Sequence, residues 1–120
     1  MLKVLLVEEK EEVIQVLTEA LTKEFSAEIL PAHNSEDAKQ QINDNEYNLI
    51  ISRNNLNDND DPAASNILNA IYDKGSEIPI IVLGEMEKGA IDFVQLPDKF
   101  GISDLILAVK KAMNFSKEDL

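Results

Sequence analysis

Five short apolar runs, separated by stretches with helical spacing, organise this chain of 120 residues. The runs cover residues 3–7, 27–30, 47–52, 78–83 and 93–96. Short apolar runs that do not alternate with polar residues are typical of strands buried on both faces, as in a parallel sheet with helices on either side. We therefore expect five strands in one parallel sheet.

Helical spacing is clearest between the first two runs. Val13, Val16, Leu17, Ala20 and Leu21 stand at positions i, i+3, i+4, i+7 and i+8, which places them on one stripe of a helix. The spacing predicts that this whole stripe packs against the sheet.

Three further helices follow from capping signals and spacing. Asn34 or Ser35 caps the second, which turns Ala38 and Ile42 inward. The third has Asp61 as N-cap, Pro62 as its first residue and Gly75 as its end. The last begins near Ile102 or Ser103, and its apolar positions are Ile102, Leu105, Ile106, Val109 and Met113.

The connection between the fourth and fifth strands is short. Only the eight residues 85–92 join the two runs, whereas a crossover between parallel strands normally takes at least about 10–12 residues including its helix. We expect the helix in this connection to be shortened or missing, so that part of the sheet face beside the last helix loses its cover.

Composition excludes several classes of function. Eleven Lys and Arg against 23 Asp and Glu give a net charge of −12, which disfavours binding to nucleic acid or to an anionic membrane. No cysteine is present, and no apolar run approaches the roughly 18 residues that span a bilayer. We expect one cytoplasmic domain at residues 1–115, with 116–120 as a tail or the start of a linker.

Charged residues follow two of the predicted strands at their ends. Glu8 and Glu9 follow the first run, and Arg53 follows the third. In parallel α/β sheets, ligands bind just beyond the carboxyl ends of the strands. These three side chains are therefore the candidate functional cluster.

Four segments resemble the receiver domains of response regulators, the CheY-like family. They are KVLLVEEKEEVIQVLTEAL from residue 3, YNLIISRNNL from 47, IPIIVLG from 78 and DFVQLP from 92. The resemblance implies an α/β, flavodoxin-like three-layer sandwich with a five-stranded parallel sheet in the order 2-1-3-4-5. It also implies a role in bacterial two-component signal transduction.

The residues that carry this family's chemistry are replaced. In active receivers the residue that corresponds to Arg53 is an aspartate, which accepts a phosphoryl group. The residue that corresponds to Gly84 is a Thr or Ser, which hydrogen-bonds that group. The residue that corresponds to Leu96 is a Lys, which forms an ion pair with it. Phe93 matches the family's aromatic switch position. The chain thus resembles a degenerate pseudo-receiver that lacks the phosphoacceptor.

Two interpretations of the acidic remnant, Glu8 and Glu9, stay open. Both carboxylates could be solvated near the start of the first helix, where the helix dipole favours them by about 0.3–1 kcal/mol. Alternatively, Arg53 replaces the divalent cation, because an attraction at about 4 Å and an effective dielectric of 20 is on the order of 4 kcal/mol before desolvation. A retained Mg²⁺ is disfavoured beside a fixed positive charge, and we expect no metal.

Other polar and special residues have simpler interpretations. The Asp- and Asn-rich stretch 54–61 lacks the Gly and Glu of an EF-hand loop, and His33 is expected to be a solvated loop residue. The family's bond before the proline is cis, which predicts a cis bond between Leu96 and Pro97.

The expected function is a non-phosphorylatable receiver domain that binds a protein and is not an enzyme. Its partner would be another protein, a neighbouring domain of the same chain or a second copy, and no cofactor is expected. The candidate interface consists of Met86, Ile91, Phe93, Ile102 and Ile106. The alternative, a small flavodoxin-like enzyme or flavin carrier, is disfavoured because the strand-end loops contain no phosphate cradle and no aromatic pair.

Overall fold

A computed structural model describes residues 2–57, 60–86 and 93–114. Its strands are β1 (Leu2–Val7), β2 (Ala27–Ala32), β3 (Leu49–Arg53), β4 (Ile80–Leu83) and β5 (Val94–Leu96). Its helices are α1 (Glu11–Glu24), α2 (Ser35–Asp44), α3 (Ala63–Lys74) and α4 (Ile102–Ala112).

All strand pairs are parallel, and the sheet order is β2-β1-β3-β4-β5. The predicted sheet and the flavodoxin-like architecture are therefore confirmed. Val7 pairs with Ser52, Arg53 with Leu83, and Leu83 with Leu96. This register brings the residues that follow β1, β3 and β4 to one edge of the sheet, as the sequence predicts.

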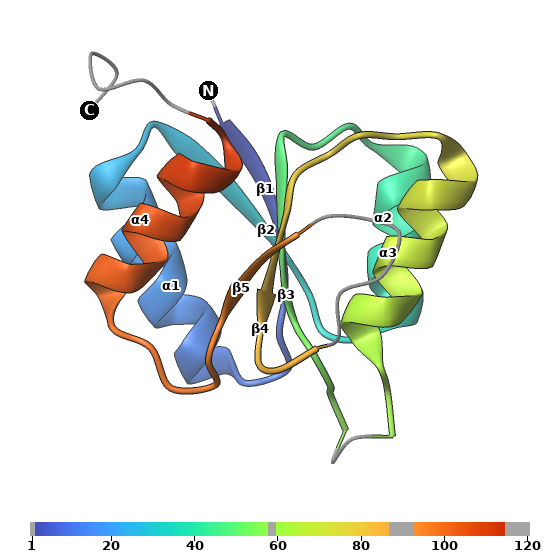
Figure 1. Cartoon of the computed structure of the whole chain (residues 1–120), viewed down its shortest axis with the longest axis horizontal. Helices are drawn as coiled ribbons and strands as arrows, with labels where there is room; N and C mark the ends of the chain where they lie inside the picture. The colour runs from blue at the N-terminus through green and yellow to red at the C-terminus, as the bar shows by residue number, and fades with distance from the viewer. Residues whose placement is uncertain (1, 58–59, 87–92, 115–120) are drawn as a thin grey trace.

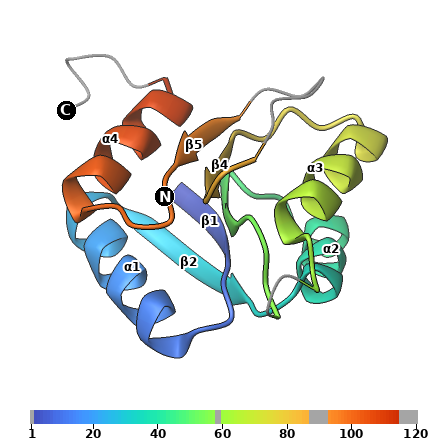
Figure 2. The same ribbon diagram turned by 60° about the horizontal axis from the view of Figure 1, so that its bottom comes forward.

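Helices cover both faces of the sheet. Helices α1 and α4 lie on one face, and α2 and α3 lie on the other (Figures 1 and 2). The side chains of the central strands alternate between two apolar clusters: Val4 and Leu6 pack on the side of α1 and α4, and Leu5 and Val7 pack on the side of α2 and α3. Burial on both faces explains why these strands contain so few polar residues.

One helix stripe differs from its prediction. Ile14, Leu17 and Leu21 are the buried residues of α1, whereas Val16 is 52% exposed. The predicted stripe was too wide because a helix that lies flat on a sheet buries only its central rows. Val16 therefore points to the outside of the layer.

The helix ends follow the capping signals with one exception. The Asn34 side chain accepts a hydrogen bond from Asp37 N at 2.8 Å, and Gly75 ends α3 with a φ of 71°. Helix α3, however, begins at Ala63 and its N-cap is Pro62, so the prediction of Asp61 as the cap was wrong. The Asp61 carboxylate instead accepts hydrogen bonds from the first residue of α2, Ser35, through N at 2.9 Å and Oγ at 2.7 Å.

The connection between β4 and β5 is described only at its two ends. Residues 87–92, including Ile91, lie outside the described residues, and Glu85, Met86 and Phe93 are not helical. On the face of α4, Ile81 and Leu83 are fully buried, and on the other face Val82 is fully buried and Phe93 is 5% exposed. The expected uncovered sheet face is therefore not found at these residues. The predicted tail at 116–120 also lies outside the described residues.

Candidate functional site

The register places Glu8 next to Arg53 because each residue directly follows a pair of facing strand residues. Arg53 Nε donates to Glu8 Oε2 at 3.2 Å. The Glu8 side chain is only 2% exposed and that of Arg53 is 19% exposed. A buried carboxylate needs such a partner, because desolvating an unpaired charge costs several kcal/mol. The solvated interpretation therefore does not apply to Glu8.

Glu9 is held in a different way from its neighbour. Its side chain is exposed, and its two carboxylate oxygens each lie 3.2 Å from the backbone N–H of Asn57. Asn57 has a φ of 52°, a left-handed conformation that asparagine tolerates better than most residues. Glu9 thus fixes the loop that follows β3, and Arg53 does not bridge the two carboxylates.

A second carboxylate near Arg53 comes from the loop after β5. Arg53 Nη1 lies 3.7 Å from Asp98 Oδ1 and 3.5 Å from the Asp98 carbonyl oxygen. The Asp98 side chain is 76% exposed, so water screens this contact. The sequence analysis did not predict Asp98 as a residue of the site. Its position two residues beyond the end of β5 could have indicated it.

Gly84 shows why no hydroxyl-bearing residue stands at the end of β4. Its φ is +114°, and a Cβ built there would lie 2.9 Å from Asp98 Oδ1 and 3.1 Å from Asn54 Cβ. Gly84 is buried, and its N–H donates to Leu96 O at 2.8 Å. A Thr or Ser side chain at this position would strain the backbone and would require the exposed Asp98 side chain and Asn54 to shift.

Leu96 and Pro97 close the same side of the site by packing. Leu96 is 8% exposed and belongs to the apolar cluster under α1 and α4. The bond between Leu96 and Pro97 is trans, so the predicted cis bond was wrong. The trans form is favoured by about 0.5–1 kcal/mol at X–Pro bonds, and here the preceding side chain packs inward instead of turning toward a charged ligand.

Two shallow hollows flank the Arg53 guanidinium. One of about 370 Å³ is lined by Glu8, Glu9, Lys10, Val13, Arg53, Asn55, Leu56, Asp98 and Lys99. The other, of about 480 Å³, is lined by Arg53, Asn54, Asn55, Glu85, Pro97, Asp98 and Lys99. Within the described residues, no group of three or more His, Cys, Asp or Glu side chains could hold a metal ion.

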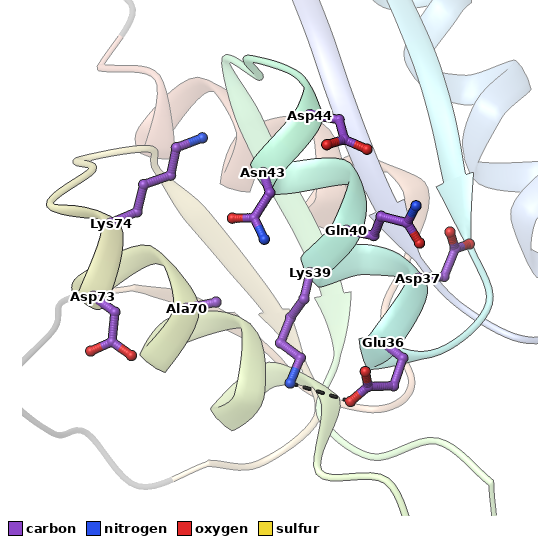
Figure 3. Close-up of a pocket in the computed structure, with 9 residues that line it drawn as sticks. All are labelled: Glu36, Asp37, Lys39, Gln40, Asn43, Asp44, Ala70, Asp73 and Lys74. Atoms are coloured by element: carbon purple, nitrogen blue, oxygen red, sulfur yellow. Dashed lines mark ion pairs between the residues drawn. The ribbon is translucent and has the colours of Figure 1, made fainter.

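A third hollow lies between α2 and α3 (Figure 3). It measures about 900 Å³ and is bordered almost entirely by polar side chains. Lys39 pairs with Glu36 at 3.3 Å, and Lys74 Nζ donates to Ile42 O at 2.6 Å. Small-molecule sites are usually concave and mostly apolar, so this charged groove does not resemble one.

The candidate interface is spread over different environments. Phe93 is buried, and Met86 is half-buried against the cluster under α2 and α3. Ile106 is half-buried against the cluster under α1 and α4, whereas Ile102 is 42% exposed. Phe93 therefore cannot take part in a surface in this conformation, whereas Met86, Ile102 and Ile106 keep part of their side chains accessible.

Two polar contacts between segments distant in sequence were not foreseen. Asp61, Ser35 and Asn66 form a hydrogen-bonded group in which Asn66 Nδ2 lies 3.2 Å from Ser35 Oγ. His33 Nε2 lies 2.6 Å from Glu11 Oε1, with both side chains largely exposed. Both contacts join segments more than twenty residues apart, which spacing along the chain cannot indicate.

Comparison with solved structures identifies the architecture. The chain aligns with a two-component response regulator from Clostridium difficile with a TM-score of 0.77 and 19% identity, over 96% of this chain and 98% of that one. It aligns with the signal receiver domain of an HD domain-containing protein from Pseudomonas fluorescens Pf-5 with a TM-score of 0.75 and 24% identity, over 94% and 87%. The chain has the receiver fold.

The receiver fold also occurs in longer proteins among these similar structures. NtrX from Brucella abortus aligns over 98% of this chain but only 28% of its own, with a TM-score of 0.73 and 23% identity. No sequence profile of a known protein family matches the chain, and no curated protein matches it. Among the described residues, no helix is both long and apolar enough to span a membrane.

Proposed function

We propose that this chain is a phosphorylation-independent module with the receiver fold, which acts in signal transduction by binding another protein. The observation that supports this most directly is the buried ion pair between Arg53 and Glu8. In the sequence resemblance to receiver domains, Arg53 stands at the position of the phosphoacceptor, so in the proposal a permanent cation takes its place. The protein would therefore keep one conformation, whereas an active receiver switches between an unphosphorylated and a phosphorylated state.

Each group needed for phosphoryl chemistry is replaced or occupied. An acyl phosphate requires a carboxylate nucleophile, and Arg53 has none. Glu8 is engaged by Arg53, and Glu9 is engaged by the backbone of Asn57, so neither offers a free ligand to Mg²⁺. Gly84 has no hydroxyl, and its φ of +114° is one that a residue with a side chain rarely adopts.

Protein binding is the role that we assign to the outer surface of the domain. In the proposal, the partner is a separate protein or a neighbouring domain, and it contacts Ile102 and Ile106 on α4. The flavin-carrier alternative finds little support, because none of the described residues that line the two hollows at Arg53 is aromatic. We propose no catalytic role.

Incubation with acetyl phosphate and Mg²⁺, followed by intact-mass measurement, tests the chemical part of the proposal. We expect no phosphoryl adduct, and no saturable NMR shifts near Glu8 when beryllofluoride and Mg²⁺ are added. Arg53→Asp is the matched variant, because it restores a carboxylate but leaves Gly84 and Leu96 in place. A stoichiometric adduct on the wild-type protein would refute the proposal.

Partner binding is tested by substitution on α4. We expect Ile102→Asp and Ile106→Asp to weaken capture of a partner while the circular dichroism spectrum stays that of the wild type. Tyr72→Asp is the control, because Tyr72 is 67% exposed on α3, on the other face of the sheet. Equal loss in the control variant would show that the partner does not bind at α4.

A further inference from the structure

Helix α4 lies between helix α1 on one side and strand β5, at the edge of the sheet, on the other (Figures 1 and 2). Its flank toward α1 is formed by Ile106 and Met113, which are half-buried against the apolar cluster that contains the buried residues of α1. Ile102 stands four residues before Ile106 and therefore shares this flank. The opposite flank of α4 faces the outside of the layer and the β5 edge.

Three exposed side chains lie along this opposite flank. Asp104, Leu107 and Lys111 stand at positions i, i+3 and i+7 of α4, a spacing that places them on one stripe of a helix. At 3.6 residues per turn, they lie about 100–160° around the helix from Ile106. Leu107 is 64% exposed, more than the other exposed large apolar side chain of α4, Ile102. The stripe thus has an acidic end, an apolar centre and a basic end.

The charges at the two ends of the stripe are available to a partner. Asp104 Oδ2 accepts a hydrogen bond from Gly101 N at 3.1 Å, and the second carboxylate oxygen has no partner among the described residues. Within the same part of the chain, the Lys111 ammonium forms no ion pair. The two charges are opposite and stand about two helical turns apart. The stripe is therefore complementary to a copy of itself that is turned end to end.

We infer that this stripe, defined by Asp104, Leu107 and Lys111, binds the same stripe of a second copy of the chain. A two-fold axis that crosses the helices at right angles near Leu107 sets the two α4 helices antiparallel. Asp104 then faces Lys111 of the second copy, the two Leu107 side chains meet at the centre, and by symmetry the ion pair forms twice. Antiparallel packing also sets the start of each helix beside the end of the other, where the helix dipoles attract.

The neighbouring charges do not cancel this complementarity. Parallel α4 helices would bring the two Asp104 side chains together and likewise the two Lys111 side chains, so like charges would meet and the antiparallel pair is selected. The glutamates of α1 lie beyond the flank of Ile106, on the far side of α4 from the contact. Lys110, at the side of the stripe, comes beside Ser103 of the second copy, which is uncharged.

The contact is small, because each copy contributes one exposed apolar side chain and two charged ones. The buried area therefore falls at the low end for specific interfaces, and the dimer is weak and reversible. The flank of Ile102 and Ile106 stays free for the partner of the proposed function. The inference thus goes beyond that function and does not rest on it.

Sedimentation equilibrium at protein concentrations up to about 1 mM tests the inference. We expect the wild type to dimerise reversibly. Asp104→Lys leaves only lysines to face each other and Lys111→Glu leaves only carboxylates, so each variant alone should raise the dimer Kd at least about tenfold. An equimolar mixture of the two variants restores lysine against carboxylate at both contacts. It should form a heterodimer with a Kd close to that of the wild type.

The mixture separates specific pairing from general repulsion. Each substitution changes the net charge by two, to −10 for Asp104→Lys and −14 for Lys111→Glu, so the mixture keeps the mean charge of −12. If only general repulsion acted, Asp104→Lys alone would associate more strongly than the wild type. The proposed pairing requires it to associate more weakly alone and to recover in the mixture.

The apolar centre of the stripe is tested without a change of charge. Leu107→Ala should raise the dimer Kd severalfold, because less apolar surface is buried in the contact. Val16→Ala is the matched control, because it shortens an exposed apolar side chain of α1 and should leave the Kd unchanged. Asp104→Lys also removes the acceptor of Gly101 N, so circular dichroism and urea unfolding must show that each variant is folded. Lys111→Glu and Leu107→Ala leave that cap intact and test the dimer by themselves.

Three results would overturn the inference: a wild type that stays monomeric at every concentration, charge variants that dimerise as the wild type does, or a mixture that forms no heterodimer. The acetyl phosphate experiment does not depend on dimerisation. Failure of the dimer would therefore leave the proposed phosphorylation-independent function standing, and a phosphoryl adduct would leave the dimer standing.

Discussion

The carboxyl edge of the sheet consists of two halves that are closed by different forces. In the half formed by β1 and β3, the ion pair of Glu8 and Arg53 is buried, and Glu9 holds the following loop. In the half formed by β4 and β5, Gly84 adopts a φ of +114° against Asn54 and Asp98, and Leu96 packs into the core. The first half is closed by charge and the second by shape.

Asp98 joins the two halves. Its carboxylate lies near Arg53 on one side and close to Gly84 on the other. Because the Asp98 side chain is largely exposed, its contact with Arg53 contributes at most about 1 kcal/mol. The comparison therefore predicts that the stability of this edge resides in the buried charge pair and in the glycine conformation, and much less in the contact between the halves.

The largest effect is expected from Arg53→Ala. The substitution leaves the buried Glu8 carboxylate without its cation. Removing one partner of a buried ion pair typically lowers the free energy of unfolding by about 3–5 kcal/mol. Urea unfolding measures the difference. Asp98→Ala is the matched control and should cost less than about 1 kcal/mol. Similar values for both variants would show that the charge pair does not close the first half.

Magnesium provides a second measurement on the same variant. With Arg53 removed, Glu8 becomes available to a divalent cation, and Mg²⁺ should raise the melting temperature of Arg53→Ala by binding the folded state. The melting temperature of the wild type should not change with Mg²⁺, because the Arg53 guanidinium already pairs with Glu8. Glu8→Gln in the Arg53→Ala background should lose the response, and retention of the response there would place the ion elsewhere.

The second largest effect should come from Gly84→Ala. A non-glycine residue at a φ of +114° is strained, and the new Cβ would lie too close to Asp98 and Asn54. We expect a loss of about 2–3 kcal/mol in the free energy of unfolding. Gly75→Ala is the control, since Gly75 has a φ of +71° with nothing within 4 Å of its Cβ position. It should cost only about 1 kcal/mol. Equal losses would mean that crowding contributes nothing at Gly84.

The third prediction compares the two neighbouring glutamates. Glu8→Gln replaces a buried charged acceptor of Arg53 and should cost about 2 kcal/mol, the range for hydrogen bonds to charged groups. Glu9→Gln changes an exposed side chain whose amide oxygen can still accept from Asn57 N, so it should cost less than about 1 kcal/mol. Chemical denaturation of both variants at one pH measures the two losses in the free energy of unfolding. A larger loss for Glu9→Gln than for Glu8→Gln would contradict the assignment of Glu8 as the buried partner of Arg53.

The smallest effect concerns Tyr47, at the opposite edge of the sheet. Burial, followed by the charges of Asp37 and Glu28, raises the pKa of Tyr47 above 10.0. The neutral phenol, which donates to Gln41 Oε1 at 2.8 Å, is thus favoured in the folded state. Its contribution is complete below pH 10 and is lost as pH rises through the folded-state pKa.

Tyr47→Phe tests this linkage. At neutral pH the variant should be less stable than the wild type by about 1 kcal/mol, because one hydrogen bond is removed. The difference should shrink as pH rises above 10, since only the wild type then ionises a group that prefers to stay neutral. A difference in the free energy of unfolding that stays constant at all pH values would contradict the raised pKa of Tyr47.

The sheet and most helix boundaries could be predicted from local patterns. Apolar runs of four to six residues indicate buried strands, and Asn34 and Gly75 mark helix ends where the structure has them. These signals succeed because a strand covered on both faces must be apolar along its length, and a helix cap bonds residues within one turn. Val16 and Asp61 were predicted wrongly, because both residues have local signals that their tertiary surroundings override.

The position of Arg53 at the end of β3 could be predicted from the sequence, because it depends only on where the apolar run stops. Which carboxylate Arg53 would bind could not be read, since Glu8 and Glu9 are adjacent and chemically alike. Strand register decided this: Glu8 follows Val7 beside Ser52 and becomes buried, while Glu9 turns outward to Asn57. Asp98 and the trans bond before Pro97 likewise depended on how the loop after β5 packs, because long-range contacts are not encoded in local spacing.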